Sequence, residues 1–158
     1  MDFYYTFVNK ALRELIRNYI KRNREQEVFL GLVGRIKAKK QDNPFLLYEI
    51  TDTIAFPNIS NNPDYQAMVT ESWYDILFEN LQLRQSTTLS PLGVLHSHVK
   101  GGNKASDLDL SFMKNLSKKL DRFIMIIISY TAVKGFHETA YVLIKEEEIK
   151  ILECKPFP

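Results

Sequence analysis

One apolar segment limits the folds open to this chain more than any other feature: residues 123–128, FIMIII. A strand that is apolar on both faces belongs in the middle of a sheet that is covered on both sides. Residues 65–81 and 107–120 have helical periodicity, and strand-like runs lie before and after each of these segments. Because strands and helices interleave along the sequence, we expect an α/β fold: a mixed central β-sheet with helices packed on it.

The N-terminal segment predicts a helix that is capped by Asp2. Apolar side chains recur there every three or four residues and predict its buried stripe. The stripe contains Tyr4, Val8, Ala11, Leu15 and Tyr19. A short apolar run with two glycines, residues 28–36, follows and predicts a buried strand.

Length and charge exclude several classes of protein. A chain of 158 residues suits one hydrophobic core, and we predict a single domain over residues 1–158. The formal net charge of +2 gives no electrostatic reason to expect a nucleic-acid partner. Charges interrupt the N-terminal segment, so it does not resemble a signal peptide, and the longest apolar run is too short to span a bilayer. We expect a cytoplasmic protein that does not bind membranes, and its oligomeric state stays open.

Two of the three histidines end the predicted strand 92–98. Alternate side chains of a strand share a face, so His96 and His98 should point the same way. A single cysteine, Cys154, rules out a zinc site built from several thiolates, so any metal must use histidine and carboxylate ligands. An isolated His-x-His also occurs at ordinary polar strand ends, and that interpretation stays open.

Asp109 is the best candidate for a third ligand, because it lies in the first turn of the predicted helix 107–120. The loop before this helix contains two glycines and can fold the helix start back over the strand end. Asp107 competes with Asp109 for this role. Ser106 and Asp109 also have the spacing of a capping box, which is compatible with metal binding.

A metal-activated water needs a general base, and Glu27 stands directly before the buried strand 28–36. From its position alone, Glu27 also fits a solvated glutamate at a strand end. His137 lies beside a predicted turn and is interpreted as an ordinary surface histidine.

These residues match one family motif in order and spacing. The chain resembles the JAB1/MPN metalloprotease family, as a compact prokaryote-like member, and its JAMM motif would consist of His96, Ser97, His98, Ser106 and Asp109. Glu27, with Gly34 seven residues later, resembles the glutamate-bearing first strand of that family. The resemblance implies the JAB1/MPN architecture, which is cytidine-deaminase-like.

The resemblance also implies roles for these residues. His96, His98 and Asp109 would hold one Zn²⁺ per chain, Glu27 would be the base, and Ser106 would help to stabilise the oxyanion. The implied enzyme is a hydrolase, a deubiquitinase-like zinc (iso)peptidase that cleaves after the C-terminal Gly-Gly of a ubiquitin-like modifier or its precursor. The implied partner is that modifier or its conjugates. The alternative is a non-catalytic zinc-binding scaffold subunit.

The loop between the second histidine and the serine departs from the family pattern. The family often has proline at both ends of this loop, where the chain has Val99 and Ala105. Because proline restricts φ and glycine does not, we expect the loop to be more flexible here.

Overall fold

The computed structural model describes residues 1–40, 42–60, 72–83, 88–100 and 102–158. The described residues form seven strands and three helices. In chain order these elements are β1 (Asp2–Phe7), α1 (Lys10–Arg22), β2 (Phe29–Lys39), β3 (Phe45–Phe56), α2 (Trp73–Leu83), β4 (Ser90–His98), α3 (Asp107–Leu116), β5 (Arg122–Thr131), β6 (Gly135–Lys145) and β7 (Ile149–Pro156).

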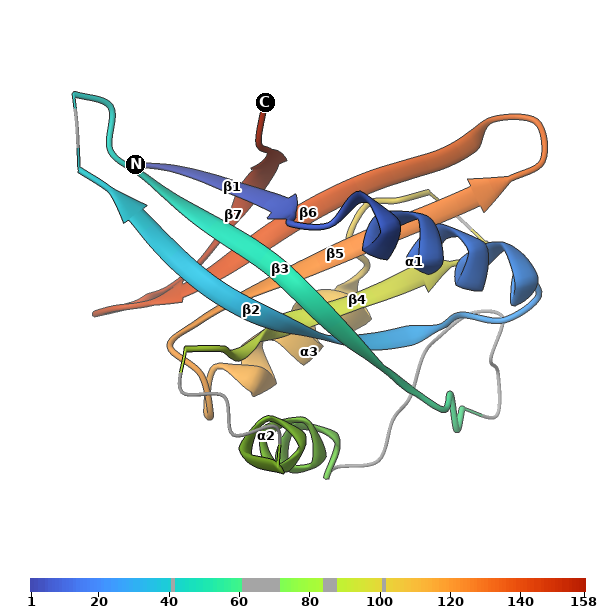
Figure 1. The fold of residues 1–158 in the computed structure, drawn as a ribbon, viewed down its shortest axis with the longest axis horizontal. Coiled ribbons are helices and arrows are strands. Elements are labelled where there is room, and N and C mark those ends of the chain that lie inside the picture. The colour runs from blue at the N-terminus through green and yellow to red at the C-terminus, as the bar shows by residue number, and fades with distance from the viewer. Residues whose placement is uncertain (41, 61–71, 84–87, 101) are drawn as a thin grey trace.

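The strands close into a barrel in the order β1-β3-β2-β4-β5-β6-β7 (Figure 1). Strands β1 and β3, and strands β4 and β5, are parallel neighbours. Strand β7 reaches β1 through two parallel pairs, Tyr4 with Lys155 and Tyr5 with Pro156. The prediction of an α/β fold, with a mixed central β-sheet, helices packed on it and the JAB1/MPN, cytidine-deaminase-like architecture, is therefore wrong.

The physical reason lies in the N-terminal segment, which the sequence predicted as one helix. Its first residues, Asp2–Phe7, instead form β1, which pairs with β3 along its whole length and allows the sheet to close. Aromatic residues and threonine favour this extended conformation. Helix α1 begins after Asn9, which caps it, and buries Ile16 and Ile20, whereas Leu15 of the predicted stripe is 65% exposed.

Strand β5 pairs with β4 on one side and β6 on the other, and residues 123–128 are buried on both faces, as predicted. One set of its side chains joins an inner cluster, and the alternate set joins an outer cluster. The inner cluster includes Tyr5, Ile16, Ile20, Leu30, Tyr48, Leu95, Ile124, Ile126, Ile128, Val142 and Cys154. The outer cluster includes Phe29, Phe56, Trp73, Leu77, Leu81, Val94, Met113, Leu116, Phe123, Met125 and Ile127.

Helices α2 and α3 pack on the outside of the barrel and contribute to the outer cluster (Figure 1). Trp73, Leu77 and Leu81 of the predicted helix 65–81 are buried, and Ile76 is 45% exposed. The first part of that prediction, residues 65–71, lies outside the described residues. Within the described ranges, no helix combines the length and apolar character needed to cross a membrane.

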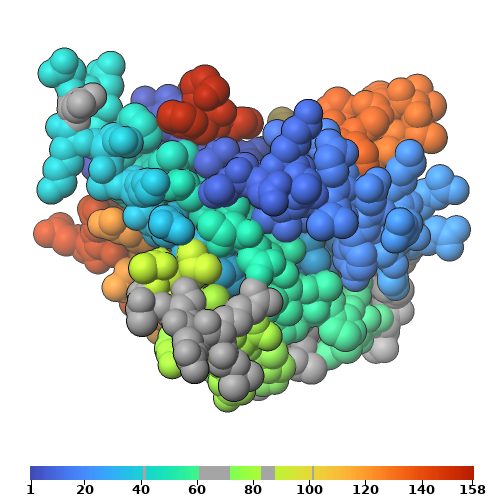
Figure 2. All heavy atoms as spheres, in the orientation of Figure 1, coloured from blue at the N-terminus to red at the C-terminus, as the bar shows by residue number. Residues whose placement is uncertain are grey.

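Helix α1 lies on the visible face of the barrel, against β3 on one side and towards the β5–β6 hairpin on the other (Figure 2). Its link to β6 is an ion-pair group that we call the Glu138 cluster: Tyr5, Arg13, Arg17 and Glu138. The Glu138 carboxylate accepts hydrogen bonds from Arg13 Nη2 at 2.6 Å and from Arg17 Nη2 at 3.2 Å. These bonds fix α1 against the strand.

Candidate metal centre

The C-terminal end of β4 and the N-terminal end of α3 meet on the outer face of the barrel. Val94 of β4 belongs to the outer cluster, so strand alternation places His96 and His98 on the same outer face. Helix α3 packs on this face through Met113 and Leu116. Its first turn therefore lies over the two histidines, as the sequence predicted.

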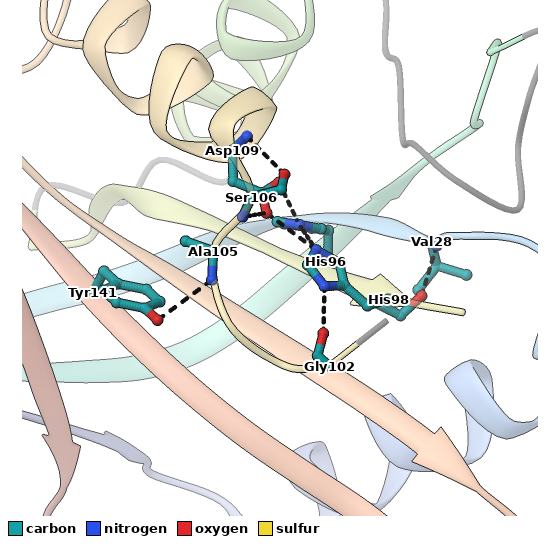
Figure 3. A network of polar contacts seen from close by, with 9 residues as sticks. Val28, His96, His98, Gly102, Ala105, Ser106, Asp109 and Tyr141 are labelled. Atoms are coloured by element: carbon teal, nitrogen blue, oxygen red, sulfur yellow. Dashed lines mark hydrogen bonds and ion pairs between the residues drawn. The ribbon is translucent and has the colours of Figure 1, made fainter. Parts of the chain in front are cut away.

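Three side chains converge at this point: His96, His98 and Asp109 (Figure 3). The two Nε2 atoms are 3.1 Å apart. Asp109 Oδ1 lies 2.9 Å from His96 Nε2, and Asp109 Oδ2 lies 3.1 Å from His98 Nε2. All three side chains are largely shielded from solvent, at 5%, 9% and 13% exposure. This group could hold a metal ion.

The separations suit a small tetrahedral ion. With metal–ligand bonds of about 2.0–2.1 Å, two ligand atoms of a tetrahedral zinc site lie roughly 3.3 Å apart. The separation of the two Nε2 atoms and the distance from each Nε2 to an oxygen of Asp109 range from 2.9 to 3.1 Å. Two imidazoles and one carboxylate are also a common ligand set for catalytic zinc.

The tautomer of His98 gives a second reason to place a cation here. His98 Nδ1 lies 2.7 Å from the carbonyl oxygen of Gly102, which can only accept a hydrogen bond. Neutral His98 therefore carries its hydrogen on Nδ1 and directs the lone pair of Nε2 at Asp109 and His96. Facing lone pairs repel one another unless a proton or a metal ion lies between them.

The pKa values of His98 and Asp109 also indicate that the site attracts a cation. Burial would lower the pKa of His98, but hydrogen bonds to Asp109 and Gly102, and the negative charges of Asp109 and Glu27, raise it above 6.5. Burial would raise the pKa of Asp109, but hydrogen bonds from both histidines, the charge of His96 and the Ser106 backbone N–H hold it well below 3.8. The carboxylate is therefore ionised and attracts a cation.

Ser106 and Asp109 form a capping box at the start of α3. The Ser106 N–H donates to Asp109 Oδ2 at 2.7 Å, and the Asp109 N–H donates to Ser106 Oγ at 3.2 Å. Both interpretations of this pair hold together, because the carboxylate caps the helix and also faces the histidines. The capping box fixes the Asp109 side chain in the position that a metal ligand needs.

Glu27 is buried beside this group, at 4% exposure, so the solvated interpretation is wrong. Two bonds between Val28 and Ser97 continue the β2–β4 pairing past Phe29: the Ser97 N–H donates to the Val28 carbonyl at 3.1 Å, and the Val28 N–H donates to Ser97 Oγ at 2.9 Å. Glu27 is two residues from Phe29, an outer-cluster residue, so its side chain shares the face of His98. Its effect on the pKa of His98 agrees with this placement.

Three contacts of the site have no signal in the sequence. The Asn58 side chain donates to the Glu27 carbonyl at 2.9 Å and accepts from the Ser60 N–H at 3.0 Å, which fixes the backbone at Glu27. The other two are the Gly102 carbonyl and the Tyr141 hydroxyl, which accepts a hydrogen bond from the Ala105 N–H. Each depends on a tertiary or loop contact that residue spacing does not reveal.

Other candidates lie away from the centre. Asp107 is exposed in the first turn of α3 and does not belong to the converging group. His137 is exposed on β6. Cys154 is part of the inner cluster, and burial raises the pKa of its thiol to about 12.

No protein-family model matches the chain, and no curated protein matches it in sequence. The chain is similar in structure to protein DSY2949 from Desulfitobacterium hafniense, solved in solution, with a TM-score of 0.60 and 18% sequence identity. The match covers 92% of this chain and 88% of that chain, and it concerns the fold alone. The predicted description as an MPN-domain metalloprotease with a JAMM motif is corrected by the closed barrel.

Proposed function

We propose that the protein is a zinc-dependent hydrolase that cleaves an amide bond. The substrate class that we propose is the peptide or isopeptide bond after the C-terminal Gly-Gly of a ubiquitin-like modifier or its precursor. The observation that carries the proposal is the convergence of His96, His98 and Asp109 beside the buried Glu27. We also propose that this activity is cytoplasmic, a setting that suits a chain with a single cysteine.

His96, His98 and Asp109 would hold the ion through Nε2, Nε2 and the carboxylate. A bound zinc ion would act as a Lewis acid and lower the pKa of a water molecule at the site to about 7. Glu27 would accept a proton from the attacking water and return it to the leaving amine. Ser106 Oγ accepts the Asp109 N–H and still has its own O–H to donate to the developing oxyanion.

The position of Glu27 supports its assignment as the base. It is a buried carboxylate with its backbone tied to Asn58, so it is held in place rather than free to move in solvent. A buried carboxylate beside a candidate metal site is typical of catalytic centres rather than of solvated strand ends.

The substitution Glu27→Gln tests the proposal. Zinc content, measured by elemental analysis, should stay at one ion per chain, because Glu27 is not in the converging group. Turnover should fall by about 10²–10⁴-fold, the usual contribution of a general base. The assay is cleavage of a ubiquitin-like protein whose C-terminal Gly-Gly is joined to a fluorogenic amine.

Glu25→Gln is the matched control, because Glu25 is an exposed glutamate two residues upstream. It should retain wild-type zinc content and turnover. Equal activity of wild type and Glu27→Gln would contradict the assigned base. A wild-type protein that holds zinc but cleaves no Gly-Gly conjugate would contradict the hydrolase and favour a non-catalytic zinc-binding module.

A further inference from the structure

The loop between β4 and α3 takes part in the metal centre. Its Gly102 carbonyl accepts the Nδ1–H of His98 at 2.7 Å, so the position of the loop sets the orientation of the ring (Figure 3). Partners of this kind orient metal-ligating histidines and fix their tautomer. The orientation of His98 therefore depends on contacts that fix this loop.

Two side chains of β6 bind this loop. The Ala105 N–H donates to the Tyr141 hydroxyl at 3.3 Å (Figure 3). Asn103 Nδ2 donates to Thr139 Oγ1 at 2.5 Å. Thr139 and Tyr141 are two residues apart on a strand, so they share a face. Asn103 and Ala105 are also two residues apart, so the loop makes two neighbouring hydrogen bonds to β6.

The surroundings make these attachments effective. Ala105 and Tyr141 both pack, partly buried, against the outer cluster. A hydrogen bond at a partly buried site competes less with water than a bond on an open surface. The bond to Tyr141 also needs an N–H at position 105, which alanine has and proline lacks.

We propose that Thr139 and Tyr141 are positioning residues of the metal centre, which hold the loop so that the Gly102 carbonyl keeps His98 in its metal-binding orientation. The proposal rests on the metal centre of the proposed function, but it does not depend on turnover. Neither residue belongs to the converging group; both would act through Asn103, Ala105 and Gly102.

The test replaces Tyr141 by phenylalanine, which keeps the ring and removes the acceptor. Zinc affinity, measured by competition with a chromogenic chelator, should fall by about tenfold, the lower end of the range for residues that support metal ligands. Hydrogen exchange of the Ala105 amide should become faster, and ring ¹⁵N shifts should show that His98 loses its fixed Nδ1–H tautomer. Thr139→Val, which removes the other acceptor, should change the same quantities in the same direction.

Tyr74→Phe is the control, because Tyr74 packs against the outer cluster from α2. It should leave zinc affinity and Ala105 exchange unchanged. Ala105→Pro removes the donor of the same hydrogen bond, so adding Tyr141→Phe to that variant should cause no further loss of affinity.

Three results would overturn the proposal. The first is wild-type zinc affinity in Tyr141→Phe, and the second is unchanged hydrogen exchange of the Ala105 amide in that variant. The third is that Tyr141→Phe lowers zinc affinity as much in the Ala105→Pro background as in the wild type. If the wild-type protein binds no zinc, the proposed function fails instead. The positioning role is then decided by Ala105 exchange and the His98 tautomer, which need no metal.

Discussion

The metal centre and the Glu138 cluster have a similar arrangement of side chains but differ in whether the protein itself supplies the positive charge. In each, one shielded carboxylate lies between two nitrogen-bearing side chains at hydrogen-bond distance. The partners of Glu138 are two arginines, which are always protonated and only donate. The partners of Asp109 are two histidines, whose ring nitrogens can accept as well as donate, so a neutral ring can direct a lone pair at the carboxylate.

This difference separates a structural ion-pair group from a site that needs a ligand. The Glu138 cluster is complete, because its cations are part of the protein and fix α1 on β6. The metal centre lacks a positive charge of its own unless a histidine is protonated. A carboxylate with two close nitrogens is therefore a sign of function only when those nitrogens are acceptors.

The substitution His98→Ala should separate the two groups most strongly. It removes a ligand outright, so zinc affinity should fall by more than the roughly 100-fold that the loss of a supporting residue causes. Isothermal titration with zinc measures this loss. His137→Ala, which removes an exposed histidine of β6, should bind zinc like the wild type. Full zinc occupancy in His98→Ala would rule out the ligand assignment.

The reverse substitution, Glu138→Gln, should damage stability and leave the metal centre intact. It removes the charge that two arginines share, at a cost of about 1–3 kcal/mol in the free energy of unfolding, measured by urea denaturation. Zinc affinity should not change. Glu148→Gln is the control, because Glu148 is 77% exposed and lies 3.8 Å from Lys150; its cost should stay below about 0.5 kcal/mol. Equal costs for the two variants would show that the Glu138 cluster contributes nothing special.

The pH dependence of stability is the smallest of the expected effects, and it should also distinguish the metal centre from the Glu138 cluster. In the metal-free protein the raised pKa of His98 contributes stability below pH 6.5, and this is lost as pH rises through the folded-state pKa. The lowered pKa of Asp109 contributes stability above pH 3.8, which is lost as pH falls through its folded-state pKa. Both contributions to the stability of the metal-free protein are therefore present between pH 3.8 and pH 6.5.

Zinc competes with the proton on His98, so its affinity should rise with pH by up to about tenfold per unit. The difference in Tm between zinc-loaded and metal-free protein should therefore widen as pH rises towards the folded-state pKa of His98, which lies above 6.5, and level off beyond it. Thermal unfolding from pH 5 to 9, with and without zinc, measures it. A difference that stays constant with pH would contradict proton competition at His98.

Short-range patterns predicted most of the centre. Strand alternation placed His96 and His98 on one face, and the first helical turn brought Asp109 to them. The barrel could not be predicted in this way, because its closure joins Tyr5 to Pro156, and β1 has a spacing that also fits a helix. The attachment of Ala105 to Tyr141 likewise depends on the neighbour strand, so the sequence alone predicted a flexible loop.

Helix α1 lies between two strand edges of the barrel that lack a paired strand among the described residues. Strand β1 pairs with β3 only as far as Ile50, and β7 pairs with β6 only from Ala140. Within the described residues, no strand pairs with one edge of β3 along residues 51–56 or with one edge of β6 along residues 135–139. Open strand edges are templates for aggregation. Because α1 lies between them, a molecule that releases this helix while the barrel stays folded would expose both edges and begin to aggregate below its global melting temperature.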